Sequence, residues 1–227
     1  MNKYLLIVAM MVSFGVYPMM AQSITEKKQV KRPVSETSFR NLVRGMDDAW
    51  FRTREARTVA DSVLAYQFPG GGWAKNQSWH QAPKKWAERA VIRKQIASPE
   101  GIGSTIDNMS TTLEMLFLAK MYEATGKKIY REAFMRGFEY LLEAQYDNGG
   151  WPQYYPLKKS HRDGRPDYSV HITYNDDAMC NVVKLMRDLA EGDKAPYDAL
   201  KLSDADKIRA QASYEKAIQC IVNTQIG

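Results

Sequence analysis

Two short polar runs contain the residues of this sequence that are best suited to chemistry. The run 105–108 reads Thr-Ile-Asp-Asn, and the run 173–176 reads Thr-Tyr-Asn-Asp 68 residues later, with a further aspartate directly after it. Carboxylate and amide oxygens are the ligands that Ca2+ prefers, and a partial protein set leaves places for a substrate carboxylate. If the two runs meet, the spacing predicts a calcium site between segments. The candidate ligands are Asp107, Asn108, Asp176 and Asp177.

The same residues also have a purely structural interpretation as helix caps. Thr111 and Glu114 have the spacing of a capping box, and aspartate and asparagine are favoured N-caps. Asp176 and Asp177 stand before the next expected helix in the same way. Capping is the commoner use of such residues, and spacing alone does not separate it from metal binding.

Two glycine turns carry the candidate substrate-binding residues. The segments 67–73 and 145–151 share the pattern Gln-x-x-x-Gly-Gly-Trp, 78 residues apart. The glycines permit a positive φ and the close approach of another backbone. Trp73 and Trp151 either close the ends of helical hairpins or line a groove and stack on sugar rings. Lys75 follows the first turn, where it would bind an anionic ligand, with a solvated surface lysine as the alternative.

The elements that must position these residues are helices. Apolar residues recur at helical spacing in 130–142 and 178–190, and further helices are expected over 50–66, 110–125 and 204–224. No stretch alternates apolar and polar residues for long enough to predict a strand. A repeat of about 70 to 80 residues with two helices and a glycine turn predicts an all-α fold of hairpins, side by side or in a ring. A ring would bring both polar runs to one end.

Composition and the N-terminus limit the class of protein. A chain of 227 residues with 26% charged residues is neither a disordered polar chain nor a polytopic membrane protein. The basic start, the uncharged stretch 4–20 and the small residues after it predict a secretory signal peptide over 1–21, with an uncleaved anchor as the alternative. We therefore expect a secreted or periplasmic protein that is free of the membrane after cleavage. Residues 22–46 are predicted to be a polar linker, and residues 47–227 the folded domain.

Several other classes of function have little support in the sequence. Cys180 and Cys220 are too few for a disulfide scaffold, and whether they pair stays open. Three scattered histidines argue against a zinc site and a catalytic triad. The formal net charge of the chain is only +6, and its basic residues are interleaved with carboxylates. We therefore expect no nucleic-acid partner. We expect a monomer.

Four stretches resemble the pectate lyases of polysaccharide lyase family 10. They are 67–76, 103–126, 140–156 (Tyr-Leu-Leu-Glu-Ala-Gln-Tyr-Asp-Asn-Gly-Gly-Trp-Pro-Gln-Tyr-Tyr-Pro) and 171–179 (His-Ile-Thr-Tyr-Asn-Asp-Asp-Ala-Met). The resemblance covers roughly residues 47–227. It implies a secreted enzyme with an incomplete (α/α)3 toroid fold. It also implies cleavage of pectate (polygalacturonate) by calcium-assisted β-elimination, with an arginine as the base.

The resemblance also implies roles for particular residues. Asp107 and Asn108 would belong to the acidic site near the scissile sugar, and the run 175–177 would supply another calcium ligand. Either Asp176 or Asp177 could be that ligand, and the internal repeat favours Asp176 because it aligns with Asn108. Family members continue well beyond the position of Gln225, and the base arginine lies in that part. We therefore expect the toroid to be truncated at the C-terminus here, and this chain alone to have little or no lyase activity.

Two other functions are compatible with the sequence. One is a non-catalytic module that binds acidic polysaccharide through Lys75, aromatic residues and calcium. The other is an α/α barrel like that of the triterpene cyclases, whose repeat also contains Gln-x-x-x-Gly-x-Trp. Those enzymes need an Asp-x-Asp-Asp acid, and the segment 174–177 (Tyr-Asn-Asp-Asp) lacks its first aspartate.

Overall fold

The computed structural model describes residues 34–79, 103–157 and 168–225, together with residues 88, 90, 91 and 94. All of them belong to one compact unit, residues 32–227. The predicted signal peptide and the first part of the predicted linker lie outside the described residues. Within the described residues, no helix combines the length and the apolar character that a membrane span requires.

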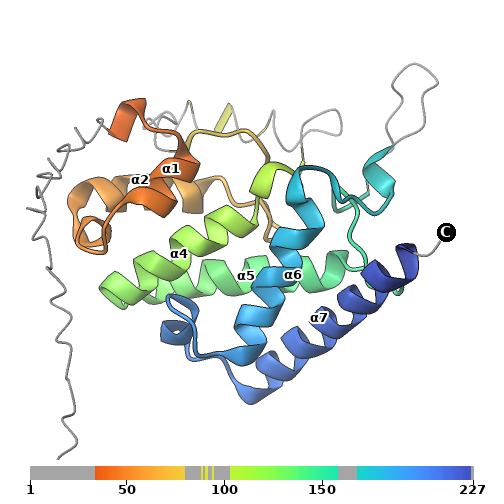
Figure 1. Ribbon diagram of the computed structural model, residues 1–227. Coiled ribbons are helices and arrows are strands. Elements are labelled where there is room, and N and C mark those ends of the chain that lie inside the picture. The colour runs from red at the N-terminus through yellow and green to blue at the C-terminus, as the bar shows by residue number, and fades with distance from the viewer. Residues whose placement is uncertain are drawn as a thin grey trace, which may run out of the picture. The chain divides into compact units, whose positions relative to one another are not determined.

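Helices dominate the described residues, as predicted (Figure 1). The α-helices are α1 (Phe39–Gly45), α2 (Arg54–Ala65), α4 (Thr112–Thr125), α5 (Lys128–Ala144), α6 (Ala178–Glu191) and α7 (Asp204–Thr224). The short 3-10 turns are η1 (Val34–Glu36), η2 (Trp50–Arg52), η4 (Asp107–Met109), η5 (Tyr168–Val170), η6 (Asn175–Asp177) and η7 (Tyr197–Leu200). The only extended pairing in this part of the chain is two isolated β-bridges, Thr105 with Tyr154 and Pro152 with Ile172. The all-α prediction is confirmed.

The helix expected over 50–66 is divided in two at Thr53. This residue has an extended backbone, and its hydroxyl accepts a hydrogen bond from the backbone N–H of Ala56 at 3.1 Å, so it caps α2. The helix expected over 204–224 agrees with α7, which Ser203 caps in the same way.

The predicted linker over residues 22–46 is wrong at its C-terminal end, because α1 belongs to the core. Phe39, Leu42 and Val43 are buried, and the ring of Phe39 packs 5.5 Å from that of Phe117 in α4. These three apolar residues have the i, i+3, i+4 spacing of one helix face, which is easily overlooked in a polar and basic segment. The folded domain therefore begins before residue 47.

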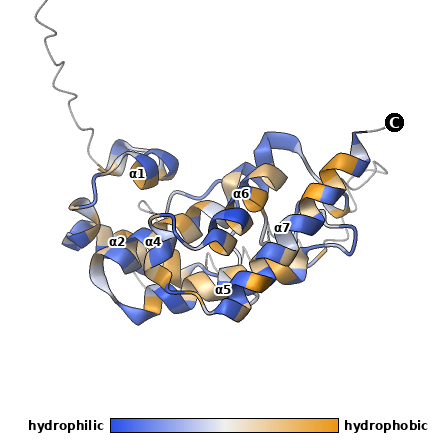
Figure 2. Cartoon of the chain, turned by 60° about the horizontal axis from the view of Figure 1, so that its bottom comes forward, coloured by the Kyte–Doolittle hydropathy of each residue, from blue (hydrophilic) through white to orange (hydrophobic). Residues whose placement is uncertain are grey.

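Helix α4 is the central element of the described fold. It packs against α1, α2, α5 and α6, and most of its residues are buried all round its circumference. The other helices carry both hydrophobic and hydrophilic residues (Figure 2), as expected for elements with one face on the core and one in solvent. Two hairpins result, α4 with α5 and α6 with α7. The polar turn η4 lies just before α4, so the core helix positions it.

The second repeated glycine turn, 145–151, joins the two hairpins, and the first, 67–73, follows α2. The side-chain amide of Gln67 donates to the carbonyl of Ala133 in α5, and that of Gln145 donates to the carbonyl of Ser213 in α7, at 2.8 and 2.9 Å. Gly149 has φ +93°, and a Cβ there would lie 2.1 Å from the carbonyl oxygen of Lys216. Each turn therefore lies directly on the second helix of a hairpin, an arrangement that only glycine permits.

The expectation that Trp73 and Trp151 stack on sugar rings is wrong. Both side chains are completely buried, and their indole N–H groups donate to the carbonyls of Val63 and Leu141 at 2.8 and 2.7 Å. Stacking on a ligand requires an exposed ring face. The two tryptophans instead close the helix ends that precede the turns, which was the structural alternative.

The sequence left open whether the two cysteines form a disulfide, and in the structure they do not. Cys180 in α6 is exposed, Cys220 in α7 is buried, and both thiols are free.

Candidate functional site

The two polar runs meet in space, as the repeat predicted. Turns η4 and η6 pack against each other, and their backbones are nearly identical. Asn108 has φ 53° and ψ 34°, and the equivalent Asp176 has φ 52° and ψ 32°. The following residues, Met109 and Asp177, also have positive φ. Left-handed backbone at residues other than glycine costs about 1 to 3 kcal/mol and is concentrated at functional sites.

The helix-cap interpretation is wrong for the side chains of Thr111 and Asp177. Thr111 precedes α4 with φ 66° and makes no side-chain cap. Its hydroxyl instead accepts from the backbone N–H of Trp73 and donates to the carbonyl of Thr105. Asp177 precedes α6 and makes no side-chain cap either. Because Asn108, Asp176 and Asp177 are exposed and do not cap helices, their side-chain oxygens are accessible to a ligand.

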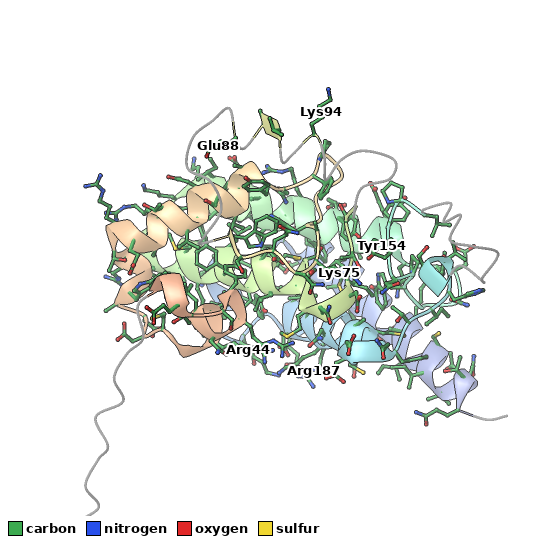
Figure 3. The ribbon with its side chains drawn as sticks, turned by 90° about the horizontal axis from the view of Figure 1, so that it is seen from above. Arg44, Lys75, Glu88, Lys94, Tyr154 and Arg187 are labelled. Atoms are coloured by element: carbon green, nitrogen blue, oxygen red, sulfur yellow. The ribbon has the colours of Figure 1, made fainter. Side chains whose placement is uncertain are left out.

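The Asp107 carboxylate is the buried centre of the site. Its Oδ2 accepts from the Lys75 ammonium at 2.5 Å and from the Gln153 amide at 2.7 Å. Its Oδ1 accepts from the backbone N–H of Asn108 at 2.9 Å. The Lys75 ammonium also lies 5.7 Å from the centre of the Tyr154 ring (Figure 3). The site therefore combines a fixed cation, a buried carboxylate and an aromatic ring.

Lys75 keeps its positive charge in this setting. Partial burial by itself lowers the pKa of the ammonium, but hydrogen bonds and charge interactions with Asp107 and Tyr154 outweigh that effect and raise the pKa above its ordinary value. The side chain is 24% exposed, whereas that of Asp107 is 4% exposed. Lys75 can therefore reach a ligand while its partner anchors it.

Three chain segments are tied together beneath these side chains by Thr105. Its backbone N–H donates to the carbonyl of Trp73 at 3.0 Å, and its hydroxyl donates to the carbonyl of Gln153. The same hydroxyl accepts from the backbone N–H of Asp107 at 3.0 Å. Nearby, the Asn108 amide donates to Asn76 Oδ1 at 3.0 Å, which leaves Asn108 Oδ1 as the atom that could bind a cation.

Sequence reasoning did not identify Gln153 and Tyr154 as site residues. Gln153 stands two residues after the tryptophan of its glycine turn, as Lys75 does after the first turn. That repeat equivalence was the signal that could have found it. The amide nitrogen of Gln153 contacts the same oxygen atom as the Lys75 ammonium.

A buried glutamate, Glu114, lies in the first turn of α4. The Trp79 indole donates to Glu114 Oε1 at 2.6 Å, while Glu114 Oε2 has no hydrogen-bond partner among the described residues. Burial raises the pKa of Glu114 to about 7, and the hydrogen bonds from Trp79 and from backbone N–H groups only partly oppose this. Glu114 is therefore a proton-binding core residue that also keeps the glutamate half of the capping box, because its carboxylate accepts from the backbone N–H of Thr111.

The residues of the site partly fit a calcium ion. Oxygen atoms of Asn108, Asp176 and Asp177 lie on two adjacent turns and are of the type that calcium prefers. Within the described residues, however, no group of three or more His, Cys, Asp or Glu side chains is close enough to hold a metal by itself. A calcium ion here would need amide, water or substrate oxygens as well.

Comparisons with known proteins agree with this fold. The solved structure of a family 10 polysaccharide lyase from Cellvibrio cellulosa is similar to this chain, with a TM-score of 0.61 and 31% identity. An aspartate-to-alanine variant of that enzyme, in complex with trigalacturonic acid, matches with the same values. The match covers 78% of this chain and 49% of the other, so the chain spans about half the length of these relatives.

This likeness agrees with the predicted α/α toroid. Among curated proteins, no match in sequence was found. The model of one family, described as pectic acid lyase, matches residues 67–227, which include both glycine turns, both polar turns and Lys75. The chain therefore belongs to the pectic acid lyase family.

Proposed function

We propose that this chain forms the calcium- and substrate-binding part of a pectate lyase that cleaves polygalacturonate by β-elimination. One observation carries the proposal. The Lys75–Asp107 pair lies at turn η4, which packs against the equivalent turn η6. A fixed cation beside two sets of exposed oxygen ligands suits a polymer whose every sugar carries a carboxylate. The trigalacturonic acid bound by the similar lyase supports this class of substrate.

Lys75 is the proposed binding group for a galacturonate carboxylate. An ammonium has three donors, of which Asp107 uses one and a hydrogen bond with Tyr154 a second, and the side chain stays partly exposed. Its raised pKa keeps it charged at neutral and mildly alkaline pH. The half-buried Tyr154 ring beside it would contact the sugar.

Calcium is the proposed cofactor, and its candidate ligands are Asn108, Asp176 and Asp177, with Asp107 through Oδ1. When bound, calcium would neutralise a substrate carboxylate and so make the neighbouring C–H bond more acidic. The residues on turns η4 and η6 would hold the ion, and the remaining coordination sites would be left to substrate and water.

The chemistry requires a base and stabilisation of negative charge. In β-elimination a base removes the C5 proton, the C4–O bond breaks, a C4–C5 double bond forms and the leaving oxygen takes up a proton. Lys75 would stabilise the enolate-like charge that develops on the carboxylate. The arginine base implied by family resemblance is not among the residues assigned here. Secretion is likewise proposed, from the signal-like residues 1–21 alone.

The first test is binding of trigalacturonate to the chain by calorimetry, with calcium and with a chelator. We expect calcium-dependent binding that Lys75→Met weakens at least about tenfold, because a charge-assisted contact of about 1.5 to 3 kcal/mol is lost. Lys128→Met removes an exposed lysine at the start of α5 and should bind like the unmodified chain. Equal binding by both variants, or none by the unmodified chain, would contradict the proposal.

The second measurement is the ultraviolet absorbance of the unsaturated product formed from polygalacturonate, in which the C4–C5 double bond is conjugated with the carboxylate. Binding without product is expected for a binding module and equally for the binding part of a lyase without its arginine base, so only the appearance of product separates the two. Product that is lost in Lys75→Met would favour the enzyme. The family match gives no support to the cyclase-like alternative.

A further inference from the structure

Two residues at equivalent places in the repeat converge on one oxygen atom. Lys75 and Gln153 each stand two residues after the tryptophan of a glycine turn. Their side chains donate to the same Oδ2 of Asp107, at 2.5 and 2.7 Å. Gln153 therefore reaches from the second unit of the repeat to the carboxylate of the first.

The hydrogen bonds restrict what each oxygen of Asp107 can do. A carboxylate oxygen has two lone pairs, so Oδ2 is saturated by its two donors. Oδ1 accepts one hydrogen bond, from the backbone N–H of Asn108, and retains one lone pair. The orientation of the carboxylate thus separates an oxygen that holds Lys75 from an oxygen that faces the polar turn.

The backbone of Gln153 is itself held by hydrogen bonds. Its carbonyl accepts from the backbone N–H of Ile106 at 3.2 Å and from the Thr105 hydroxyl. Both donors belong to the segment that leads directly into Asp107. This fixed backbone places the Gln153 side chain within reach of the carboxylate, so its amide can determine how the carboxylate is oriented.

We propose that Gln153 is a positioning residue that orients the Asp107 carboxylate and so holds the Lys75 ammonium where a uronate carboxylate binds. An amide suits this role because its N–H group donates the hydrogen bond that the Asp107 carboxylate accepts. An ionised carboxylate at position 153 could not donate one. The role of the ligand in this inference rests on the proposed function, whereas the anchoring of Lys75 can be measured without any ligand.

The test is a double-mutant cycle on trigalacturonate affinity in the presence of calcium. We expect Gln153→Met to weaken binding about tenfold, as for loss of a hydrogen bond to a charged group. In the Lys75→Met background the same change should weaken it less than about twofold, because Gln153 acts through Lys75. Gln153→Glu, which keeps the shape and loses the donor, should weaken binding at least as much. Equal losses from Gln153→Met in both backgrounds would overturn the positioning role.

Gln211→Met is the matched control. The Gln211 amide also donates to a carboxylate, that of Glu215, at 2.7 Å, but on the exposed surface of α7. Its replacement should leave affinity unchanged. A loss equal to that of Gln153→Met would mean that the effect is not specific to the site.

A second measurement is independent of the ligand. Acylation of individual lysines, followed by mass spectrometry, reports how firmly each ammonium is held. We expect Gln153→Met to increase the rate at Lys75 several-fold and to leave Lys128 unchanged. An unchanged rate at Lys75 would overturn the inference. If the unmodified chain does not bind trigalacturonate, the proposed function fails, and this rate alone decides the role of Gln153.

Discussion

At the scale of single residues, the site depends on one buried carboxylate and its donors. Asp107 is almost inaccessible to solvent, yet Lys75, Gln153 and the backbone of Asn108 satisfy its oxygens. A buried charge is tolerated only when it is paired and hydrogen-bonded in this way. Glu114 contrasts with it, because it is buried with one oxygen unpartnered among the described residues.

The raised pKa of Glu114 predicts a pH-dependent stability. A glutamate carboxyl ordinarily titrates at 4.5, whereas Glu114 titrates at about 7 when folded. Between these values the folded chain keeps a proton that the unfolded chain has lost. Stability should therefore be full below pH 4.5 and fall as the pH rises to about 7, by about 3 kcal/mol in total.

Glu114→Gln should remove this part of the pH dependence, because glutamine stays neutral and still accepts from the Trp79 indole. Urea unfolding at several pH values measures it. Glu132→Gln is the control, since Glu132 is exposed on the neighbouring helix α5. The same slope in Glu114→Gln as in the unmodified chain would show that Glu114 does not cause the loss.

At the scale of elements, the glycine turns and helix α4 bring the site together. The turns fix where Lys75 and Gln153 emerge, because each turn lies on a helix of a hairpin through a glutamine amide. The start of α4 fixes Asp107. The positions of the side chains in the candidate site therefore follow from contacts between the turns and the helices rather than from contacts among these side chains alone.

Gly149→Ala should disrupt the contact between the second glycine turn and α7. The new Cβ would lie 2.1 Å from the Lys216 carbonyl oxygen at a φ of +93°, so we expect a loss of about 3 kcal/mol. Gly126→Ala is the matched control, since Gly126 also has a positive φ, of +65°, but nothing lies within 4 Å of its added Cβ. It should cost about 1 kcal/mol. The midpoints of urea unfolding, compared at an unchanged m-value, measure both losses of stability. Equal losses in the two variants would show that the contact between Gly149 and α7 is not important for stability.

At the scale of the whole molecule, the proposed calcium ion would connect successive units of the repeat. Turn η4 leads into α4, and turn η6 leads into α6. A ligand that binds only the folded chain raises its stability, by about 2.7 kcal/mol at a concentration one hundred times its Kd. Calcium should therefore raise the melting temperature of the chain, and magnesium should raise it less.

The same melting experiment distinguishes the two candidate aspartates. Asp176 has the backbone conformation of Asn108, its equivalent in the repeat, so Asp176→Asn should abolish more of the calcium-dependent shift than Asp177→Asn. No shift in the unmodified chain would mean that the turns do not bind calcium, and a larger effect of Asp177→Asn would reverse the assignment.

The sequence alone determined the helices, the repeat and the meeting of the two polar runs. Apolar periodicity is a local signal for a helix, and a repeated turn sequence folds in the same way in each unit of the repeat. It also indicated the family. It did not decide that Trp73 and Trp151 are buried, that the polar runs do not cap helices, or that residues 39–45 belong to the core. Those outcomes depend on which neighbours surround a side chain.

Only the tertiary structure decided the centre of the site. Lys75, Asp107 and Gln153 lie on three separate segments, and nothing in their spacing fixes which atoms meet. Their convergence follows from the hydrogen bonds of Thr105 and from the packing of η4 on η6. The residue types specify what chemistry is possible, and long-range packing determines which of these groups come within a hydrogen-bond length of one another.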